Sequence, residues 1–329
     1  WVPDSSFPKY PGSLGTISGV AADDVHTEVY FARRVQGAPP TEQDPILVFD
    51  FSGSFLRKFG QGTSARATGA GLIVTSHSIR MDPSLNSTWV LYSRSIDTSL
   101  HCVRQFSRTG VLLTTLGTCG VPGMTLCPVT FTEPTDIAFG SEGSMWISDG
   151  DDSSGAPTSV HSPGNNRVLK FNSDLQLILA LGGVSGNQTY QFNQPHSIGV
   201  DDGFRLWVAD RANSRISVFS DEGVYLGGFS DAGCIGTRPN SLYFVSPTSV
   251  LVSTNSVGPL PNNIRVLAVP PAGEDLPEDC IVTGQFTSTA VAHMLSGDST
   301  GAIYLAELGT GLQKFVNQTT AKEHFSVQK

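Results

Sequence analysis

A repeated pattern of about 55 residues constrains the fold of this chain more than any other feature of its sequence. One copy reads EPTDIAFGSEGSMWISDG and continues with NNRVLKF, and the next reads QPHSIGVDDGFRLWVAD and continues with RANSRISVFSDEGVYLGGF. Each copy holds four short apolar runs separated by Gly, Asp, Asn and Ser, a pattern typical of β-strands joined by turns. Four strands per repeat is the content of one propeller blade.

Weaker copies of the first strand begin at residues 18, 76, 239 and 292, which gives six repeats in 329 residues. The repeats predict an all-β fold, a six-bladed propeller with four-stranded blades around a central channel. We expect a single domain over residues 1–329, with a short extended N-terminal arm over about residues 1–14. A pair of β-sandwiches is the alternative, but it does not explain why the second strand of each repeat ends in Asp after an aromatic residue.

Histidines recur at one position of the repeat. Aligning the first strands places the following residues at equivalent positions: Ser18, His77, Thr135, His196, Asn240 and His293. The three histidines belong to alternate repeats, so a six-bladed ring would point them at its axis about 120° apart. Three imidazoles with an open fourth position are one ligand set of catalytic zinc sites, so the pattern predicts a zinc site. The alternative is that each histidine is a hydrogen-bonded structural residue. The other histidines, expected at the surface or in turns, are His26, His101, His161 and His324.

Composition excludes several kinds of partner. The formal net charge is −9, and charged residues make up 15% of the chain, so we expect neither nucleic-acid nor anionic-membrane binding. No apolar run is long enough for a membrane span, and the first residues lack the features of a targeting signal, so we expect a soluble and already processed chain. Three sequons, at Asn86, Asn187 and Asn317, predict a secreted glycoprotein.

Five cysteines leave at least one without a partner within the chain. Spacing alone does not determine the connectivity. We expect a first disulfide between Cys119 and Cys127, which flank the segment GVPGMTL, and a second between Cys234 and Cys280, which leaves Cys102 free.

The repeats resemble NHL repeats. The stretch PHSIGVDDGFRLWVADRANSRISVF, with SGVAADDVHTEVYFARR and DPILVFD before it, resembles the peptidyl-alpha-hydroxyglycine alpha-amidating lyase domain of peptide-amidating enzymes. The resemblance implies a zinc-bearing propeller that cleaves a hydroxylated C-terminal glycine into a peptide amide and glyoxylate. It places the zinc ligands on His77, His196 and His293.

The resemblance also assigns two arginines. Arg33, in YFARR, matches an arginine of the lyases that contacts substrate and active site, although Arg34 beside it leaves the register open by one residue. Arg211, in VADRANSR, matches a second arginine. For Arg211 a salt bridge at a blade edge is the alternative to a role in the channel.

Two family positions are not matched. The catalytic tyrosine of the lyases is replaced by Asp151, which follows Asp149 and Gly150 and precedes Asp152. We expect Asp151 to receive the proton, with its pKa raised by burial and by the two like-charged neighbours; a solvated loop end is the alternative. The aspartate that ligates a structural calcium in the family is replaced by Met294, so calcium is not expected there.

Three functions follow from this sequence. The first is a secreted amidating-lyase-like zinc enzyme with weak activity. The second is a non-catalytic extracellular propeller that binds a peptide or another ligand at the channel mouth, where the polar insertion at residues 151–165 would form a lid or docking loop. The third is a self-associating structural protein, joined through the N-terminal arm or the odd cysteine.

Overall fold

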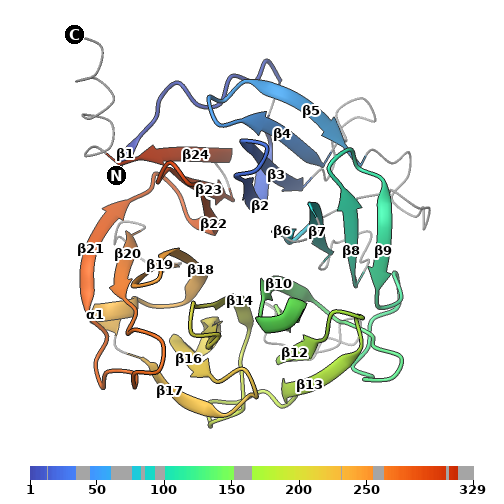
Figure 1. The fold of residues 1–329 in the computed structure, drawn as a ribbon, viewed down its shortest axis with the longest axis vertical. Coiled ribbons are helices and arrows are strands. Elements are labelled where there is room, and N and C mark those ends of the chain that lie inside the picture. Colours follow the sequence, from blue (N-terminus) through green and yellow to red (C-terminus); the bar gives the residue numbers. More distant parts are fainter. Residues whose placement is uncertain are drawn as a thin grey trace.

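The chain folds into a ring of six four-stranded antiparallel sheets around a central channel (Figure 1). This is a computed structural model, and it describes residues 1–12, 14–34, 45–60, 76–82, 86–92, 101–151, 165–230, 232–254, 263–308 and 311–317. The six-bladed propeller predicted from the repeats is confirmed. Among the residues that the structure describes, no helix has the length and apolar character that crossing a membrane requires.

Blades 1 to 5 each take four consecutive strands, with the first nearest the axis. Blade 1 is β2 (Thr16–Asp23), β3 (Glu28–Arg34), β4 (Ile46–Asp50) and β5 (Phe55–Phe59), and blade 2 is β6 (Ser78–Asp82), β7 (Ser87–Tyr92), β8 (Cys102–Ser107) and β9 (Leu112–Leu116). Blade 3 is β10 (Pro134–Phe139), β11 (Met145–Asp149), β12 (Arg167–Phe171) and β13 (Leu177–Gly182), and blade 4 is β14 (Pro195–Val200), β15 (Leu206–Asp210), β16 (Arg215–Phe219) and β17 (Tyr225–Phe229).

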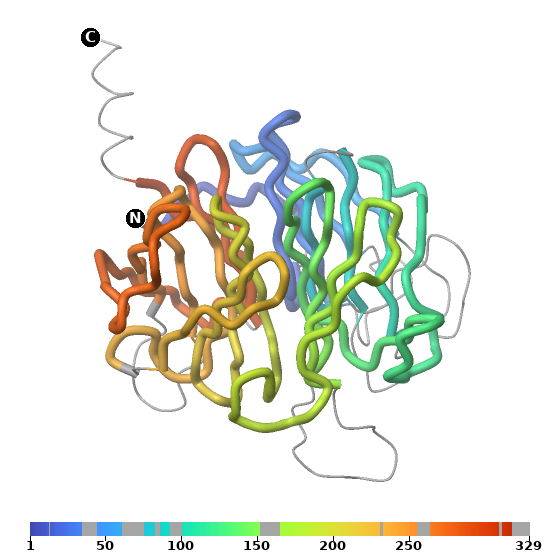
Figure 2. The backbone as a smooth tube through the Cα atoms, turned by 60° about the horizontal axis from the view of Figure 1, so that its bottom comes forward, coloured from blue at the N-terminus to red at the C-terminus, as the bar shows by residue number. Residues whose placement is uncertain are grey.

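The last two blades complete the ring. Blade 5 is β18 (Pro239–Ser246), β19 (Ser249–Thr254), β20 (Asn263–Ala268) and β21 (Val282–Thr287), and blade 6 is β22 (Ala292–Gly297), β23 (Ile303–Glu307), β24 (Gly311–Val316) and β1 (Val2–Pro3). The short helices are η2 (Ser141–Gly143), η3 (Arg211–Asn213) and α1 (Ala232–Ile235). Figure 2 shows the strands running between the two faces of the ring.

Burial explains the strand sequences. The inner strands are covered on both faces by neighbouring blades, so β11 and β15 are buried at every residue. The outermost strands of blades 2 and 3, β9 and β13, alternate between more and less exposed residues because one face meets solvent. The aromatic residue that recurs in the second strand is buried between blades, as Trp89, Trp146 and Trp207 show.

The N-terminal arm closes the ring. Val2 and Pro3 pair with Val316 and Phe315 of β24, so the first residues of the chain form the outer strand of the last blade. Phe7 then packs among Phe31, Phe49 and Tyr304 in the core between blades 6 and 1. The arm is therefore used within its own chain rather than left free for strand addition to a neighbour.

The disulfides differ in part from the expected pairs. The structure joins Cys102 to Cys119, with Cα atoms 5.0 Å apart, and leaves Cys127 free and exposed, so the expected bond between Cys119 and Cys127 is wrong. Because β9 runs antiparallel to β8 and ends beside its start, the chain brings Cys119 back to Cys102. Cys234 and Cys280 are paired as expected, with Cα atoms 6.2 Å apart.

A buried carboxylate links blades 1 and 2. Glu28 Oε1 accepts hydrogen bonds from Arg57 and Arg108, at 2.8 and 2.7 Å, and Glu28 Oε2 accepts one from the Tyr30 hydroxyl at 2.7 Å. Burial alone would raise the pKa of Glu28, but these hydrogen bonds outweigh it and lower the pKa to about 2. Because the pKa of Glu28 is lower in the folded than in the unfolded chain, the ionised carboxylate stabilises the fold at pH values above the unfolded pKa. This stabilisation is lost as the pH falls toward 2.

We therefore predict that Glu28→Gln lowers the free energy of unfolding by about 1–2 kcal/mol at neutral pH. The difference from wild type should shrink between about pH 4.5 and 2, because the wild-type carboxylate becomes protonated there. Urea unfolding at a series of pH values measures both effects. The exposed Glu222 gives a matched control: a Glu28→Gln deficit that is independent of pH, or a Glu222→Gln variant with the same profile, would contradict the prediction.

Candidate metal centre

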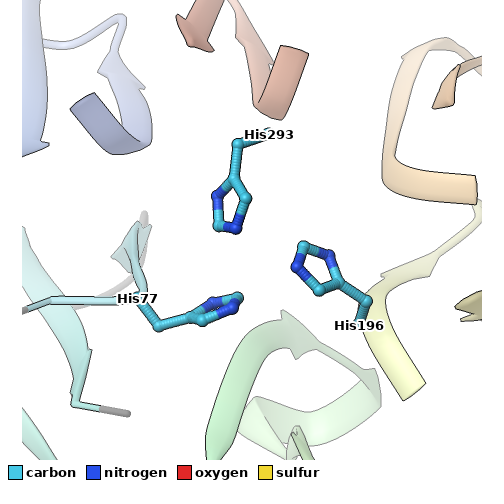
Figure 3. Close-up of side chains that lie close together, drawn as sticks. All are labelled: His77, His196 and His293. Atoms are coloured by element: carbon cyan, nitrogen blue, oxygen red, sulfur yellow. The ribbon is translucent and has the colours of Figure 1, made fainter. Parts of the chain in front are cut away.

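Three buried histidines meet on the channel axis (Figure 3). His77 directly precedes β6, His196 lies in β14 and His293 lies in β22, so all three lie at the N-terminal ends of first strands. Their ring centroids are 4.7 to 4.8 Å apart, and the nitrogens available as ligands lie within 4.8 Å of one another. The convergence predicted from the repeat register is present.

Each imidazole is oriented by a hydrogen bond that it donates to a carbonyl of the neighbouring blade. The Nδ1 atoms lie 2.8, 2.7 and 2.6 Å from the carbonyl oxygens of Thr135, Asn240 and Ser18, for His77, His196 and His293 respectively. These acceptors are the residues at the equivalent position of the other three blades. Because a carbonyl only accepts, Nδ1 must carry the proton, and a neutral ring then has its lone pair on Nε2.

His196 and His293 are in the neutral form that binds metals. Burial is the largest cause that holds the pKa values of His196 and His293 well below the usual range, and the nearby Arg211 guanidinium and the other imidazoles add to it. His196 Nε2 is also buried and has no hydrogen-bond partner in the part of the chain that the structure describes. Neutral imidazoles with Nδ1 bonded to carbonyls are the arrangement in which histidine ligates zinc.

Asp151 and Arg211 lie beside the histidines. Asp151 follows β11, and Arg211 begins η3 directly after β15, so both leave the second strand of their blade at the end where the histidines lie. Asp151 Oδ2 is 3.2 Å from His77 Nε2, and Asp151 Oδ1 accepts a hydrogen bond from Arg211 Nη1 at 3.1 Å. The sequence left open whether Arg211 forms a salt bridge at a blade edge or acts in the channel. The structure has a salt bridge, to Asp151, and it lies beside the histidines in the channel.

The expected direction of the Asp151 pKa shift is wrong. Burial would raise this pKa, but His77, Arg211 and Arg34 outweigh it and lower the pKa below its usual value. The carboxylate of Asp149 is turned away, toward Asn165 and Arg167, at 2.7 and 3.1 Å. Asp152 and the rest of the insertion, residues 152–164, lie outside the described residues.

The arginine of blade 1 that faces the site is Arg34. The positive charge of Arg34 lowers the pKa values of Asp151 and His293. This effect requires Arg34 to lie near both residues. Neighbouring residues of a strand point to opposite faces. The structure therefore favours Arg34 over the expected Arg33, and the Arg34 Nε atom is buried with no hydrogen-bond partner among the described residues.

The residues behind His293 do not fit calcium. Met294 is fully buried in place of a carboxylate, and the guanidinium of Arg80 donates to Asp136 Oδ1 at 2.7 Å and to the Leu295 carbonyl at 2.8 Å. Calcium takes six to eight oxygen ligands. Here the Asp136 carboxylate and the Leu295 carbonyl already accept hydrogen bonds from an arginine.

The remaining predicted residues are dispersed. His26 lies beside Asp23 in a turn, whereas His101 is buried and bonded to the Thr132 carbonyl, against the expected surface position. His161 and His324 lie outside the described residues. Of the sequon asparagines, Asn86 and Asn187 are exposed and Asn317 is half-buried.

This fold and its channel define a six-bladed propeller of the NHL-repeat class, and the NHL repeat model matches residues 192–219. NHL repeat-containing protein 3 of Homo sapiens is 33% identical over 321 residues, which cover 95% of this chain and 83% of that protein. The chain belongs to the family of NHL repeat-containing protein 3.

Two further similarities concern the fold and the site. A probable peptidyl-alpha-hydroxyglycine alpha-amidating lyase of Caenorhabditis elegans is 30% identical over 155 residues, which cover 46% of this chain and 39% of that protein. The solved structure of a streptogramin B lyase superimposes with a TM-score of 0.52 at 13% identity, covering 94% of this chain and 95% of that one. The latter similarity shows the fold alone.

We predict that the purified chain holds about one zinc ion and that His196→Ala weakens its zinc affinity more than about 100-fold. The variant should also lose the thermal stabilisation that zinc gives, because the ion binds only the folded state. Elemental analysis and melting curves with and without zinc measure this. His26→Ala is the control, since His26 lies in a turn with Asp23; a zinc-free wild type after zinc loading would contradict the prediction.

Proposed function

We propose that this chain is a secreted, zinc-centred propeller of the amidating-lyase type, which converts a peptidyl-alpha-hydroxyglycine slowly into a peptide amide and glyoxylate. One observation carries the proposal: three imidazoles, each fixed through Nδ1, bring their ligand nitrogens together at one end of the channel. Bound there, zinc would polarise an alcohol oxygen and lower its pKa. His77, His196 and His293 would hold it.

The arginines suit the carboxylate of such a substrate. Arg211 and Arg34 both lie near Asp151, and neither side chain is fully buried. Guanidinium groups bind carboxylates in a bidentate way. We assign to Arg34 and Arg211 the binding of the glycyl carboxylate, which would compete with Asp151 for the Arg211 side chain.

Among the described residues, Asp151 places a carboxylate oxygen that can accept a proton 3.2 Å from His77 Nε2. In the reaction the hydroxyl proton moves to the Asp151 carboxylate, the hydroxyl oxygen forms a carbonyl, the C–N bond breaks, and the proton passes to the amide nitrogen. The pKa of Asp151 is lowered, so it is a weak base. A well-matched general base contributes roughly 10² to 10⁴ in rate, so the reaction should be slow.

The relatives support this proposal to different degrees. The Caenorhabditis elegans protein bears the name of the lyase, and its similarity covers less than half of this chain. The human relative, similar over nearly the whole chain, is named for its repeats and not for a reaction. The residues of the channel therefore carry the assignment.

A non-catalytic binding module is the second candidate. The observation that favours it is the pairing of Asp151 with both His77 and Arg211, which occupies the groups a substrate would use. Such a module would keep the metal and bind a peptide or another extracellular ligand at the same mouth of the channel. Propellers host unrelated functions on one scaffold, so the fold is compatible with either candidate.

Secretion is proposed on two observations. The structure contains two disulfides, which persist in oxidising compartments. Asn86 and Asn187 are exposed, as an N-glycosylation acceptor must be. Mass spectrometry of glycopeptides from natively produced protein tests this proposal.

We predict that the zinc-loaded wild type releases glyoxylate from a peptidyl-alpha-hydroxyglycine at least about 10-fold faster than His77→Ala. Arg34→Ala should raise KM more than it lowers kcat, because Arg34 binds the carboxylate in substrate and transition state alike. A coupled glyoxylate assay measures both variants, with Glu222→Gln as the control. Equal rates for wild type and His77→Ala would end the lyase proposal and leave the binding module.

A further inference from the structure

The carboxylate of Asp151 lies where a fourth metal ligand would lie. Its Oδ2 atom is 3.2 Å from His77 Nε2 and 4.0 Å from His196 Nε2. Two ligands of a tetrahedral zinc ion, each about 2.0 to 2.1 Å from the metal, are about 3.3 to 3.4 Å apart. The distance from Asp151 Oδ2 to His77 Nε2 thus matches the distance between two ligands of one zinc ion. The distance to His196 Nε2 exceeds that ligand–ligand distance by less than about 1 Å.

This contact requires a cation. His77 Nδ1 donates to the Thr135 carbonyl, so Nε2 is the nitrogen that faces Asp151, and in the metal-binding form of the ring it is an acceptor. An ionised carboxylate is also an acceptor only. Two acceptors at 3.2 Å repel each other unless a proton on Nε2 or a metal ion lies between them.

Arg211 holds the carboxylate in this orientation. It binds Oδ1 at 3.1 Å and leaves Oδ2 directed at the histidines. The Arg211 side chain is 13% exposed and that of Asp151 is 15% exposed, so solvent competes weakly with the pair. A ligating carboxylate is usually fixed by such a partner on its second oxygen.

We propose that Asp151 is the fourth ligand of the metal and that Arg211 positions it, which makes a closed centre of three histidines and one aspartate. The inference rests on the metal centre of the proposed function, and it describes the ligands of that centre before a substrate binds. A substrate must displace Asp151 from the metal, and the displaced carboxylate then remains next to the reacting group. Closed four-ligand zinc sites are otherwise typical of structural roles.

Cobalt(II) tests the inference without any enzyme assay, because its visible spectrum reports the coordination sphere. We expect the cobalt-loaded wild type to have a tetrahedral spectrum that millimolar azide leaves unchanged. In Asp151→Asn and Asp151→Ala, azide should shift the spectrum, and cobalt affinity should fall about 10- to 100-fold. Arg211→Ala should keep cobalt but admit azide, and Glu222→Gln should behave as wild type.

The outcomes separate the two proposals. If azide changes the wild-type spectrum as much as that of Asp151→Asn, the centre has an open position and Asp151 is not a ligand. If folded wild type binds no cobalt, the metal centre of the proposed function itself fails. Circular dichroism of each variant establishes that it is folded, and Asp151→Asn preserves the side-chain volume if Asp151→Ala does not fold.

Arg80 and Asp136 form an ion pair that joins several blades. Arg80, on β6, binds Asp136 through two parallel hydrogen bonds, from Nε at 2.7 Å and from Nη2 at 2.8 Å, and it binds the Leu295 carbonyl through Nη1. Asp136 is fully buried and also accepts a hydrogen bond from the Ser197 hydroxyl at 2.6 Å. One ion pair thus connects blades 2, 3, 4 and 6.

We infer that the Arg80 guanidinium is the structural cation of this propeller, so the fold needs no calcium ion on its axis. The carboxylate and carbonyl oxygens that a hard cation would need are already bonded to the arginine. Five donors in a rigid plane allow a guanidinium to satisfy oxygens from several blades at once. The inference is independent of the metal at the histidines.

Melting temperatures test it. The wild type, freed of calcium with EGTA and then reloaded with zinc, should melt at the same temperature with and without millimolar calcium. Arg80→Met should melt roughly 5 to 10 °C lower, because it leaves a buried carboxylate unpaired. Arg80→Met combined with Asp136→Asn should recover part of this loss. A wild type that calcium stabilises, or an Arg80→Met variant as stable as wild type, would overturn the inference.

Discussion

Every junction between neighbouring blades is closed by a polar side chain at the channel, and the ring depends on these bonds. Six inner strands surround one narrow axis, where an unpaired polar group would be costly because water is largely excluded. Hydroxyl groups therefore bond to the next strand. The hydroxyls of Ser18, Ser78 and Thr135 donate to the carbonyl oxygens of Ser76, Thr135 and Pro195, respectively. The hydroxyls of Ser197, Ser241 and Ser296 accept from the backbone amides of Leu242, Leu295 and Ala22, respectively.

The same requirement produces the metal centre. Each imidazole donates to the main-chain carbonyl at the equivalent position one blade further on, so histidines alternate with Thr135, Asn240 and Ser18 around the ring. The three ligand nitrogens are thus positioned by rigid strands rather than by loops, which keeps their geometry fixed. Arg80 divides the channel beneath them and lines a separate cavity of about 330 Å³ at the opposite end.

The parts that sequence reasoning predicted are those that the repeat register determines. The six blades and the convergence of His77, His196 and His293 follow from one alignment of first strands, because equivalent positions of a propeller occupy equivalent places around the axis. The sequence left the register between Arg33 and Arg34 open, and this matters because a shift of one residue reverses the face of a strand. The Cys119 partner depended on where the chain runs after β9, which spacing in the sequence does not determine.

The Asp151 environment was mispredicted for a related reason. Sequence neighbours suggested repulsion from Asp149, but that side chain bonds to Asn165, and the true neighbours of Asp151 come from other blades. Around this carboxylate lie two guanidinium groups, of Arg34 and Arg211, and the three imidazoles of the site. A divalent ion held by the histidines would add its positive charge to that of these guanidinium groups. With a metal bound, the site would prefer anions although the chain has a net charge of −9, and an anionic ligand could take the Asp151 position on the metal and on Arg211 together.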